Sequence, residues 1–479
     1  MQLTIEQEFE EFHYALESTA WQTSLPSFQL YTSKIVSSSP KVSVIIANFN
    51  NAPYLNKMLD SLVNQTIGSE HLQIMFIDDK STDKSLEIVM PYLDKYQGVE
   101  IYALDKNTGG AHGPRNVGIL NARGEYLVFL DADDWYNLDA LRYLSDLLDD
   151  SGDDFAVSGL VQSKNGEITL KSKPYFYDGD FKNRSIQELP TEFYGWLGPQ
   201  AIMLRRSLVI ENNLHFVNQR VADDVTFFYE ALRFSKTITQ GSRLTTYLNR
   251  DADNVSLSKA INRNFMISWL RALSFINQKF PDDDSKRRFL SRRIEWLVHD
   301  FIFKPNIGYK FSKKRMLDFK AQLDYYLPNL GFDVSFYFKN HARKVAWDYL
   351  EKKAFSTLFK FISLFLVRYI LFDKLKLKKM SSDAVYYPEL FRIFPNIKVD
   401  LYAKLVKKNA HSVEIQVFSN SPIKGFALKD SKNPFYGRKC FKFEQLSETR
   451  YVIKDFDDKN LEKLQVYNSN YLEVGISNV

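Results

Sequence analysis

The stretch that decides the fold is Glu125-Tyr-Leu-Val-Phe-Leu-Asp-Ala-Asp-Asp-Trp-Tyr136. An uninterrupted apolar run, residues 127–130, ends in the carboxylates Asp131, Asp133 and Asp134. Such a run predicts a strand buried on both faces, as in a parallel sheet covered by helices. Open α/β sheets bind ligands at the carboxyl ends of their strands, where these acids fall. Asp131 and Asp133 could therefore hold a hard cation and, through it, a diphosphate. The competing interpretation is an acidic turn that caps a helix.

Strand and helix patterns alternate on the amino-terminal side of this stretch. Buried strands are predicted at residues 42–46 and 73–77, and a shorter strand at 99–104. Asn51, followed by Pro53, favours a helix start after the first strand. Strand, helix, strand, helix and strand in this order predict a mostly parallel α/β domain.

A glycine-rich turn follows the third predicted strand. It reads Asp105-Lys-Asn-Thr-Gly-Gly-Ala-His-Gly-Pro-Arg-Asn116 and leads into a helix that ends near Asn121. Glycines let the backbone approach a ligand closely, and the start of the helix, which carries Arg115, favours negative charge. The turn therefore predicts contact with a phosphate or nucleotide. The simpler interpretation is a turn without a ligand.

Four segments taken together resemble family 2 glycosyltransferases with the GT-A fold. They are Val42-Ser-Val-Ile-Ile-Ala-Asn-Phe-Asn50, Ile77-Asp-Asp-Lys-Ser-Thr-Asp83, the turn ending in Arg115-Asn116, and Leu130-Asp-Ala-Asp-Asp134. The resemblance covers residues 41–255. Within the family, the glycine turn and the domain layout are most similar to bacterial enzymes that glycosylate wall teichoic acid and related surface polymers. The resemblance implies a UDP-sugar donor and transfer with inversion.

The resemblance also implies roles for individual residues. Asp133, assisted by Asp131, matches the ligand of a divalent ion, Mn²⁺ or Mg²⁺. Asp224 matches the general base, because the acceptor hydroxyl must lose its proton as it attacks. By pattern alone, Asp223-Asp224 would only begin a helix. The positions that match donor contacts of the family are Ala47, Phe49, Asp79, Asn107, Arg115, Asp131 and Ala132.

Two positions depart from the family pattern. The first strand ends in Ala-Asn-Phe-Asn where the family usually has Pro-Thr-Tyr-Asn, so Phe49 would stack on uracil without a hydroxyl. Lys80 replaces the usual glycine after the paired aspartates, which makes this loop harder to predict. Two further segments have open interpretations. Trp196-Leu-Gly-Pro-Gln200 suits a sugar-stacking floor or a packed turn. Residues 247–258 resemble a segment that closes over the diphosphate, or form a plain loop.

The remaining regions are predicted to be accessory. Residues 1–40 suit a helical arm and a linker, residues 41–258 the catalytic domain and residues 259–380 a helical region. From 381 to 479, apolar and polar residues alternate in short runs separated by turns, which predicts a small β-sandwich. Carbohydrate binding, homo-oligomerisation and packing are all open roles for it.

The helical region contains one strongly amphipathic stretch, residues 355–372. Phe359, Ile362 and Leu366 lie on its broad apolar face, and four lysines follow between 374 and 379. Eighteen residues with two internal charges are marginal for spanning a bilayer. They suit an interfacial helix on anionic lipid, or else a helix packed between domains.

Composition limits the alternatives. The single cysteine, Cys440, excludes an intramolecular disulfide and a cysteine-based metal site. A net charge of +5 is too small to indicate a nucleic-acid partner. The amino terminus lacks the basic and apolar regions of a secretory signal, so a cytoplasmic location, in contact with the inner membrane face or free of it, is expected.

The sequence therefore predicts an inverting, metal-dependent hexosyltransferase. Its donor would be a UDP-sugar, with GlcNAc or another hexose, and its acceptor a hydroxyl of a teichoic acid, a polysaccharide or a lipid-linked precursor. A non-catalytic carbohydrate-binding or scaffolding protein is the alternative, but it has no reason to keep both Asp133 and Asp224. A processive synthase would need a Gln-x-x-Arg-Trp motif and several spanning helices. A nucleotidyltransferase would need a lysine-bearing glycine loop near its start.

Overall fold

The structure is a computed structural model whose described residues fall into two compact units. The larger unit contains the residues up to Phe338 together with Arg343–Phe359, and the smaller contains 340–342 and the residues from Lys360 onward. The described residues are 21–164, 167–170, 180–189, 193–195, 197–219, 221–251, 262–303, 312–338, 340–363, 401–409, 411–419, 423–428, 440–441, 443–447, 450–454, 456, 464–468 and 473–475.

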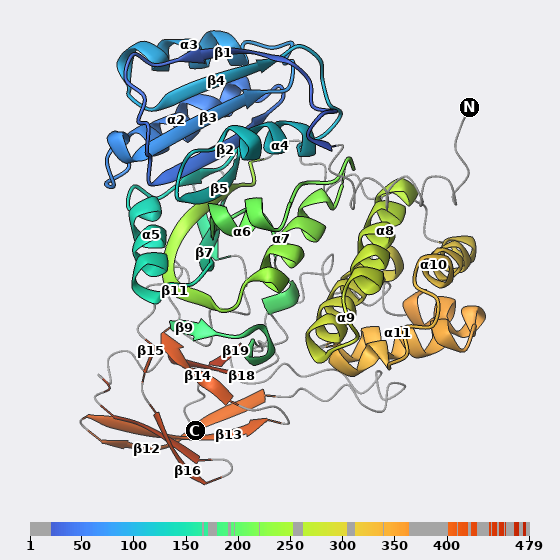
Figure 1. The fold of residues 1–479 in the computed structure, drawn as a ribbon. Helices are drawn as coiled ribbons and strands as arrows, with labels where there is room; N and C mark the ends of the chain where they lie inside the picture. Colours follow the sequence, from blue (N-terminus) through green and yellow to red (C-terminus); the bar gives the residue numbers. More distant parts are fainter. Residues whose placement is uncertain are drawn as a thin grey trace. The chain divides into compact units, whose positions relative to one another are not determined.

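An eleven-stranded sheet forms the centre of the larger unit (Figure 1). Its strands are β1 (Phe28–Thr32), β2 (Val42–Asn48), β3 (Leu72–Asp78), β4 (Val99–Leu104), β5 (Tyr126–Asp131), β6 (Trp135–Tyr136), β7 (Phe155–Lys164), β8 (Glu167–Leu170), β9 (Phe181–Arg184), β10 (Ile202–Arg205) and β11 (Ile238–Asn249). The order is β1-β4-β3-β2-β5-β10-β7-β11-β6, with β8 paired to β7 and β9 to β11. The neighbours β4, β3, β2 and β5 are parallel, which confirms the predicted α/β class.

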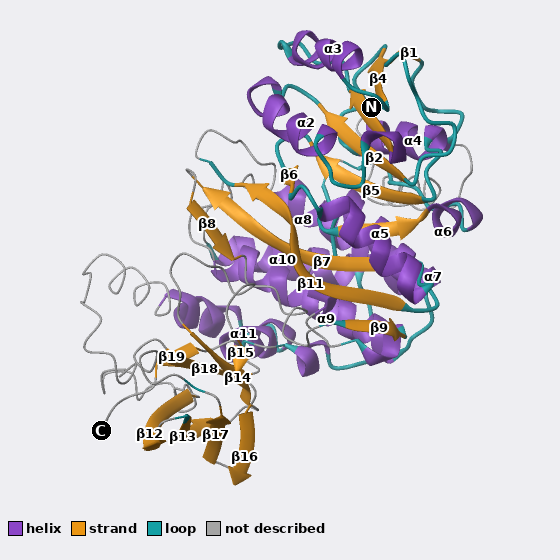
Figure 2. Cartoon of the chain, turned by 90° about the vertical axis from the view of Figure 1, so that its left-hand side faces the viewer, coloured by secondary structure: helices purple, strands orange, loops and turns teal. Residues whose placement is uncertain are grey.

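Helices cover both faces of this sheet (Figures 1 and 2). The α-helices are α2 (Leu55–Val63), α3 (Ser85–Lys95), α4 (His112–Asn121), α5 (Ala140–Ser151), α6 (Arg206–Glu211), α7 (Asp223–Phe234), α8 (Arg263–Lys279), α9 (Asp284–Val298), α10 (Lys313–Tyr326) and α11 (His341–Glu351). A π-helical turn, His299–Phe303, extends α9. The 3₁₀ turns are Ala52–Tyr54, Ser69–His71, Ile186–Glu188, Phe193–Gly195 and Val334–Tyr337. One core joins α2, α3 and α5 to β2, β3 and β5, while α4 packs against the opposite face of β2.

β5 is apolar on both faces because it lies between these helical layers. Val128 and Leu130 belong to the core beneath α2 and α5. Phe129, on the other face, packs edge-on against Phe216 and Phe227, with ring centroids 5.0 and 5.3 Å away. The prediction of a strand buried on both faces is confirmed.

α4 approaches β2 very closely at Gly118. A Cβ added there would lie 2.4 Å from Cγ2 of Ile45, closer than carbon atoms pack. Glycine at this position therefore lets α4, and the turn that precedes it, lie directly on the sheet.

The amino-terminal region differs from the prediction. β1, within the predicted arm and linker, pairs antiparallel with β4 at the edge of the sheet. Most of its side chains are exposed, including Leu30 at 46%, so it lacks the alternation that identifies a half-buried strand. The helical pattern over 1–20 lies outside the described residues. Asn51 does take the predicted N-cap position, with Pro53 in the first turn, but its side chain donates to the Phe49 carbonyl and makes no cap hydrogen bond.

Lys80, which stands where the family usually has glycine, adopts a left-handed backbone conformation with φ 63°. A Cβ in this region clashes with the following carbonyl oxygen. We therefore expect Lys80→Gly to raise the free energy of unfolding by about 1 kcal/mol, net of the entropy that glycine loses on folding. Urea unfolding of both proteins measures this. Lys80→Ala is the matched control, because it removes the side chain but keeps the Cβ. Equal stability of the two variants would contradict the expectation.

The smaller unit contains two four-stranded antiparallel sheets. Their strands are β12 (Leu401–Asn409), β13 (Ser412–Ser419), β14 (Ile423–Leu428), β15 (Cys440–Phe441), β16 (Phe443–Ser447), β17 (Arg450–Lys454), β18 (Leu464–Asn468) and β19 (Glu473–Gly475). Both sheets contribute to one core, made of Val413, Ile415, Val417, Phe426, Tyr451, Ile453, Phe456 and Leu464. The predicted β-sandwich is confirmed.

Residues 355–363 are helical, as predicted, whereas 364–379 lie outside the described residues. Leu358 and Ile362 have no exposed surface, and Phe359 is partly buried. Ile362, for which contact with lipid and packing within the protein were both open, is therefore enclosed. Helical periodicity does not distinguish a protein partner from a membrane. Within the described part of the chain, every helix is too short or too polar to cross a bilayer.

Candidate functional site

The acid cluster, Asp131, Asp133 and Asp134, lies where β5 ends. The parallel register pairs Asp131 with Ala47 on β2, so these strand ends are neighbours at one edge of the sheet. Each acid contributes one carboxylate oxygen to a group in which all oxygens lie within 4.8 Å of one another. The sequence thus located the acidic edge of the sheet correctly.

The three acids have different surroundings. Asp134 is 2% exposed and accepts a hydrogen bond from the backbone N–H of Asn249 at 2.8 Å. Burial, together with the nearby carboxylates of Asp133 and Asp131, raises the pKa of Asp134 well above its usual range. Asp131 and Asp133 are only partly buried. Asp134 therefore fixes the end of β11 to the cluster, while the other two keep surface that a ligand can reach.

Arg115 joins the acid cluster to the start of α7. Its guanidinium donates to Asp223 Oδ2 at 3.0 Å and to Asp131 Oδ1 at 2.8 Å, and the residue is 6% exposed. Burial lowers the pKa of Arg115, but the two carboxylates more than offset this, so the pKa is raised. The sequence matched Arg115 to a diphosphate contact. In the structure, one nitrogen of its guanidinium donates to each of two protein carboxylates.

Sequence reasoning missed a second donor to Asp131. Gln200 Nε2 donates to Asp131 Oδ2 at 2.9 Å, so each oxygen of Asp131 has a protein partner. Two residues earlier, a Cβ built on Gly198 would lie 3.6 Å from Asp224 Oδ2. The turn at 197–200 therefore bonds to Asp131 and passes beside Asp224. Trp196, the aromatic residue of the proposed sugar floor, lies outside the described residues.

Asp223 and Asp224 begin α7, and only one of them is paired with Arg115. Asp223 is 7% exposed, and burial raises its pKa to about 7 even though Arg115 opposes the shift. Asp224 is partly buried, and its side chain forms no hydrogen bond to another described residue. Burial raises the pKa of Asp224 as well, opposed by Arg115 and Arg293. Asp224 is therefore the carboxylate of this pair that is free to accept a proton.

Arg293 brings a third helix, α9, to the site. Its Nη2 donates to the carbonyl of Leu197 at 3.0 Å, and its charge acts on Asp224. An arginine in a basic helical region carries no sequence signal of a site. Only the packing of α9 in the same compact unit as the sheet reveals this role.

The predicted donor contacts differ in exposure. Phe49 is 48% exposed at the end of β2, whereas Ala132 is 2% exposed within the core and offers only its backbone. Asp79 is also 2% exposed, and Thr108 donates to its carboxylate from the backbone N–H at 2.9 Å and from the hydroxyl at 3.0 Å. Asn107 Nδ2 donates to the Asp79 carbonyl at 2.7 Å. Asp79 and Asn107 therefore hold the glycine turn against the end of β3.

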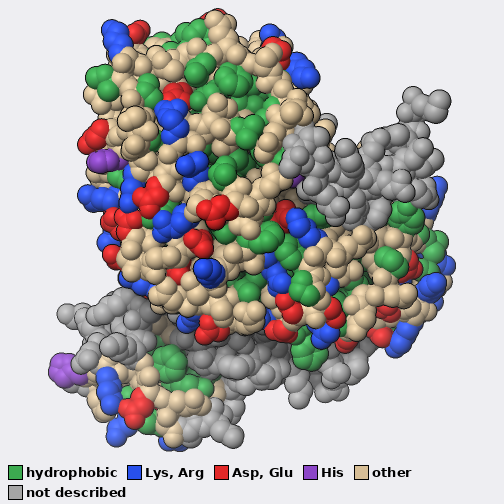
Figure 3. All heavy atoms as spheres, in the orientation of Figure 1, with side chains coloured by type: hydrophobic (Ala, Val, Ile, Leu, Met, Phe, Trp, Pro, Cys, Tyr) green, Lys and Arg blue, Asp and Glu red, His purple; other side chains and the backbone are tan. Residues whose placement is uncertain are grey.

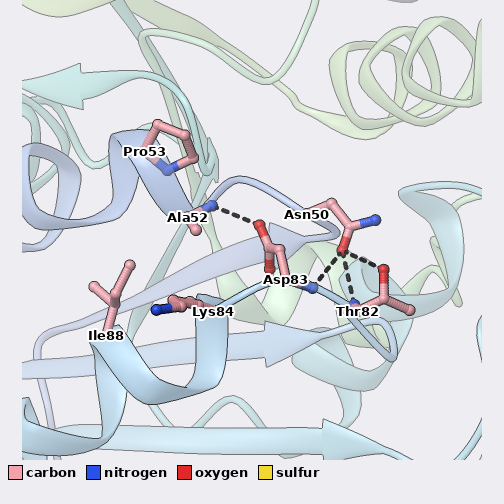
Figure 4. A pocket seen from close by; sticks show the side chains of 7 residues that line it. All are labelled: Asn50, Ala52, Pro53, Thr82, Asp83, Lys84 and Ile88. Atoms are coloured by element: carbon pink, nitrogen blue, oxygen red, sulfur yellow. Dashed lines mark hydrogen bonds between the residues drawn. The ribbon is translucent and has the colours of Figure 1, made fainter.

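The loops after β2 and β3 are bonded to each other (Figure 4). Asn50 Oδ1 accepts from the backbone N–H of Thr82 at 2.8 Å, and Asp83 Oδ2 accepts from that of Ala52 at 2.9 Å. Asp83 thus supplies the cap that Asn51 does not. An open hollow beside these loops is lined by Asn50, Ala52, Pro53, Thr82, Asp83, Lys84 and Ile88. None of these is a predicted site residue.

An aromatic pair follows the acid cluster directly. Trp135 stacks on Tyr247 with ring centroids 5.6 Å apart and planes 5° from parallel. The ammonium of Lys57 lies 3.3 Å from the centroid of the Trp135 ring. Tyr247 begins the segment that the family resemblance assigns to closure over the diphosphate, and residues 252–258 of that segment lie outside the described residues.

Charges elsewhere on the larger unit are mixed. On the face drawn in Figure 3, basic and acidic side chains are interspersed among the coloured residues. This agrees with the small net charge of the chain.

Part of this chain is similar to known proteins. The model of the family described as Glycosyl transferase family 2 matches residues 43–209. A poly(ribitol-phosphate) beta-glucosyltransferase of Bacillus spizizenii is 32% identical over 230 residues, 47% of this chain and 35% of that protein. The poly(ribitol-phosphate) beta-N-acetylglucosaminyltransferase TarS of Staphylococcus aureus is 27% identical over 282 residues, 57% of this chain and 46% of that protein. The chain thus spans less than half the length of these two relatives.

A solved structure shares the fold. The crystal structure of S. aureus TarS 1–349 in complex with UDP-GlcNAc matches with a TM-score of 0.58 at 20% identity, covering 68% of this chain and 91% of that chain. At this identity the likeness concerns the fold alone. The segment that carries most of the acidic sheet edge thus matches the model of glycosyltransferase family 2, and the fold is of the GT-A type predicted from the sequence.

Proposed function

We propose that this chain transfers a sugar from a UDP-sugar to a hydroxyl group of a surface polymer, with inversion at the anomeric carbon. The observation that carries the proposal is the buried ion-pair network in which Arg115 connects Asp131 at the end of β5 to Asp223 at the start of α7. We expect this network to hold the acid cluster and the Asp224 carboxylate in one site. A leaving diphosphate and a general base are the two groups that inverting transfer requires close together.

The acid cluster fits a divalent ion by its chemistry. Its three carboxylates offer hard oxygen ligands, which Mg²⁺ and Mn²⁺ prefer. Asp133, assisted by Asp131, would hold the ion, because both are only partly buried, whereas Asp134 is 2% exposed. When bound, such an ion stabilises the negative charge that develops on a leaving diphosphate.

Asp224 would act on the acceptor. Its carboxylate would accept the proton of the attacking hydroxyl while the bond from the anomeric carbon to the diphosphate breaks. Because the acceptor attacks without a covalent enzyme intermediate, one base is sufficient and the configuration inverts. Asp223 is not available for this role while it is paired with Arg115.

Relatives support the choice of substrates. Two of them are named for glucosyl and N-acetylglucosaminyl transfer to poly(ribitol phosphate), and one solved neighbour was crystallised with UDP-GlcNAc. We propose UDP-GlcNAc or UDP-glucose as the donor and a teichoic acid or a related polymer as the acceptor. Phe49, with nearly half of its surface exposed, is the candidate for stacking on the uracil. Contact with anionic lipid and oligomerisation through the β-sandwich stay predictions.

The decisive experiment is donor screening by UDP release. The chain is incubated with Mn²⁺, a poly(ribitol phosphate) acceptor and, in turn, UDP-GlcNAc, UDP-GalNAc, UDP-glucose and UDP-galactose. We expect acceptor-dependent UDP release with one preferred donor. A carbohydrate-binding or scaffolding protein would bind the polymer and release no UDP, which would overturn the proposal.

The raised pKa of Asp224 predicts an acid limb in the rate profile. A base acts only when ionised, so kcat should fall tenfold per pH unit below its pKa. Burial, together with Asp131, moves this pKa upward, and Arg115 and Arg293 only partly offset the shift, so the limb should lie above the usual aspartate value of 3.8. Steady-state kcat measured from pH 5 to 8 tests this. The residual kcat of Asp224→Asn should not show this fall at low pH. If the fall persists in this variant, another group causes it.

A further inference from the structure

α4 makes three contacts to the segment that leads into the candidate base. We call residues 216–219 and 221–224 the base segment. The His112 ring lies beside the backbone of Gln219, and Arg115 pairs with Asp223. Asn116 donates from Nδ2 to the carbonyl of Phe216 at 2.7 Å, and its Oδ1 accepts from the N–H of Phe216 at 2.8 Å. At positions i, i+3 and i+4, all three side chains lie on one face of the helix.

The base segment does not acquire its conformation from local preference. Ala222, directly before α7, has φ 65°, in the left-handed region that disfavours residues with a Cβ. The first turn of α7 has no side-chain cap from this residue. Contacts from outside the segment must therefore maintain it, and the face of α4 supplies them.

The contact at Phe216 is transmitted to α7 by packing. The Phe216 ring stacks on Phe227 with centroids 4.1 Å apart and planes 13° from parallel, and the Arg115 guanidinium lies 5.0 Å from its centroid. Phe227 lies one helical turn after Asp223 and Asp224. A shift of Phe216 would therefore move both the helix that carries Asp224 and the guanidinium that pairs with Asp223.

We infer that Asn116 is a positioning residue for the general base: through Phe216 it fixes the start of α7, and so the place of Asp224 beside the acid cluster. This inference rests on the proposed function. Asn116 is 3% exposed and both atoms of its amide are used by the Phe216 backbone, so its effect on transfer is indirect.

The test compares Asn116→Leu with Asn121→Leu. Both residues lie on α4, but the Asn121 amide bonds only to the carbonyl of Val117 within the helix. In Asn116→Leu, kcat should fall by about 10²-fold, the scale expected for a misplaced catalytic group, with the donor KM within about twofold of the parent. Asn121→Leu should retain the parental kcat. Asn116→Asp keeps the acceptor for the Phe216 N–H and should lose less.

A double-mutant cycle separates positioning from general damage. If Asn116 acts through Asp224, then Asn116→Leu should cause little further loss in the Asp224→Asn background. Multiplicative losses, or a raised donor KM at unchanged kcat, would overturn the inference.

A second measurement does not depend on activity. Amide hydrogen exchange in the base segment should accelerate in Asn116→Leu and stay unchanged in Asn121→Leu. Unchanged exchange in both variants would refute the inference, whatever the enzyme does. If the parent protein transfers no sugar, the proposed function is refuted instead. Faster exchange in Asn116→Leu would still show that Asn116 restrains the base segment.

Discussion

Asp224→Asn is expected to leave donor binding intact and to lower sugar transfer by about 10²–10⁴-fold. The amide preserves the size of the side chain and its position at the start of α7, but it cannot accept the proton of the acceptor hydroxyl. Since Asp224 forms no hydrogen bond to another described residue, the substitution breaks no hydrogen bond within the described part of the chain. Transfer at saturating donor and acceptor measures kcat, and calorimetric titration with UDP measures donor binding.

Asp223→Asn is the matched control for this experiment. Its carboxylate pairs with Arg115 at 3.0 Å, so the amide weakens a buried ion pair and should lower the melting temperature. The two variants thus predict different primary effects, on the rate and on stability. A different outcome would identify Asp223 as the base: normal turnover in Asp224→Asn, together with a large loss of rate at unchanged stability in Asp223→Asn.

Asp133→Ala is expected to abolish metal-dependent turnover while the fold stays intact. Its carboxylate is partly buried at the start of the turn after β5 and lies outside the hydrophobic core. Transfer is measured across a titration with Mn²⁺ and Mg²⁺ and after chelation. Binding of Mn²⁺ itself, followed by electron paramagnetic resonance, gives a readout that does not require transfer. A variant that binds Mn²⁺ and transfers sugar like its parent would exclude Asp133 as a ligand.

Asp134→Asn provides the comparison within the same cluster. Its side-chain oxygen can still accept the hydrogen bond from the Asn249 N–H, so the end of β11 should keep its place. The substitution removes a carboxylate whose pKa is already raised by burial, and we expect Mn²⁺ affinity to change much less than in Asp133→Ala. Equal losses in both variants would make Asp134 a ligand in its own right.

The positions of Asp131 and Asp223 also explain why Arg115 is buried at this point. Asp131 and Asp223 are like charges brought together by the fold, and one guanidinium between them offsets their repulsion. Arg115→Lys would keep the charge but lose the fork that reaches both carboxylates. The guanidinium is therefore a structural requirement of the site, separate from any contact that it makes with a donor.

Much of the fold was readable from local sequence. The apolar run that ends in Asp131 predicted a buried strand and an acidic sheet edge, because a strand covered on both faces has no polar position until it reaches the ligand-binding end. The glycine turn, α4 and the alternation in the carboxyl-terminal strands followed from equally local rules. β1 did not, since an exposed edge strand carries no alternation of apolar residues.

The sequence by itself therefore determined the domain type, a parallel α/β scaffold, and predicted the acids proposed to carry the chemistry, Asp131, Asp133 and Asp224. Tertiary structure alone decided how these groups are held. Pairing of Arg115 with Asp223 spans 108 residues, and the contact of Gln200 with Asp131 spans 69. Arg293 reaches the site from a helix beyond the predicted catalytic boundary. Such contacts depend on where distant elements pack, and no periodicity, cap or turn residue in the chain encodes them locally.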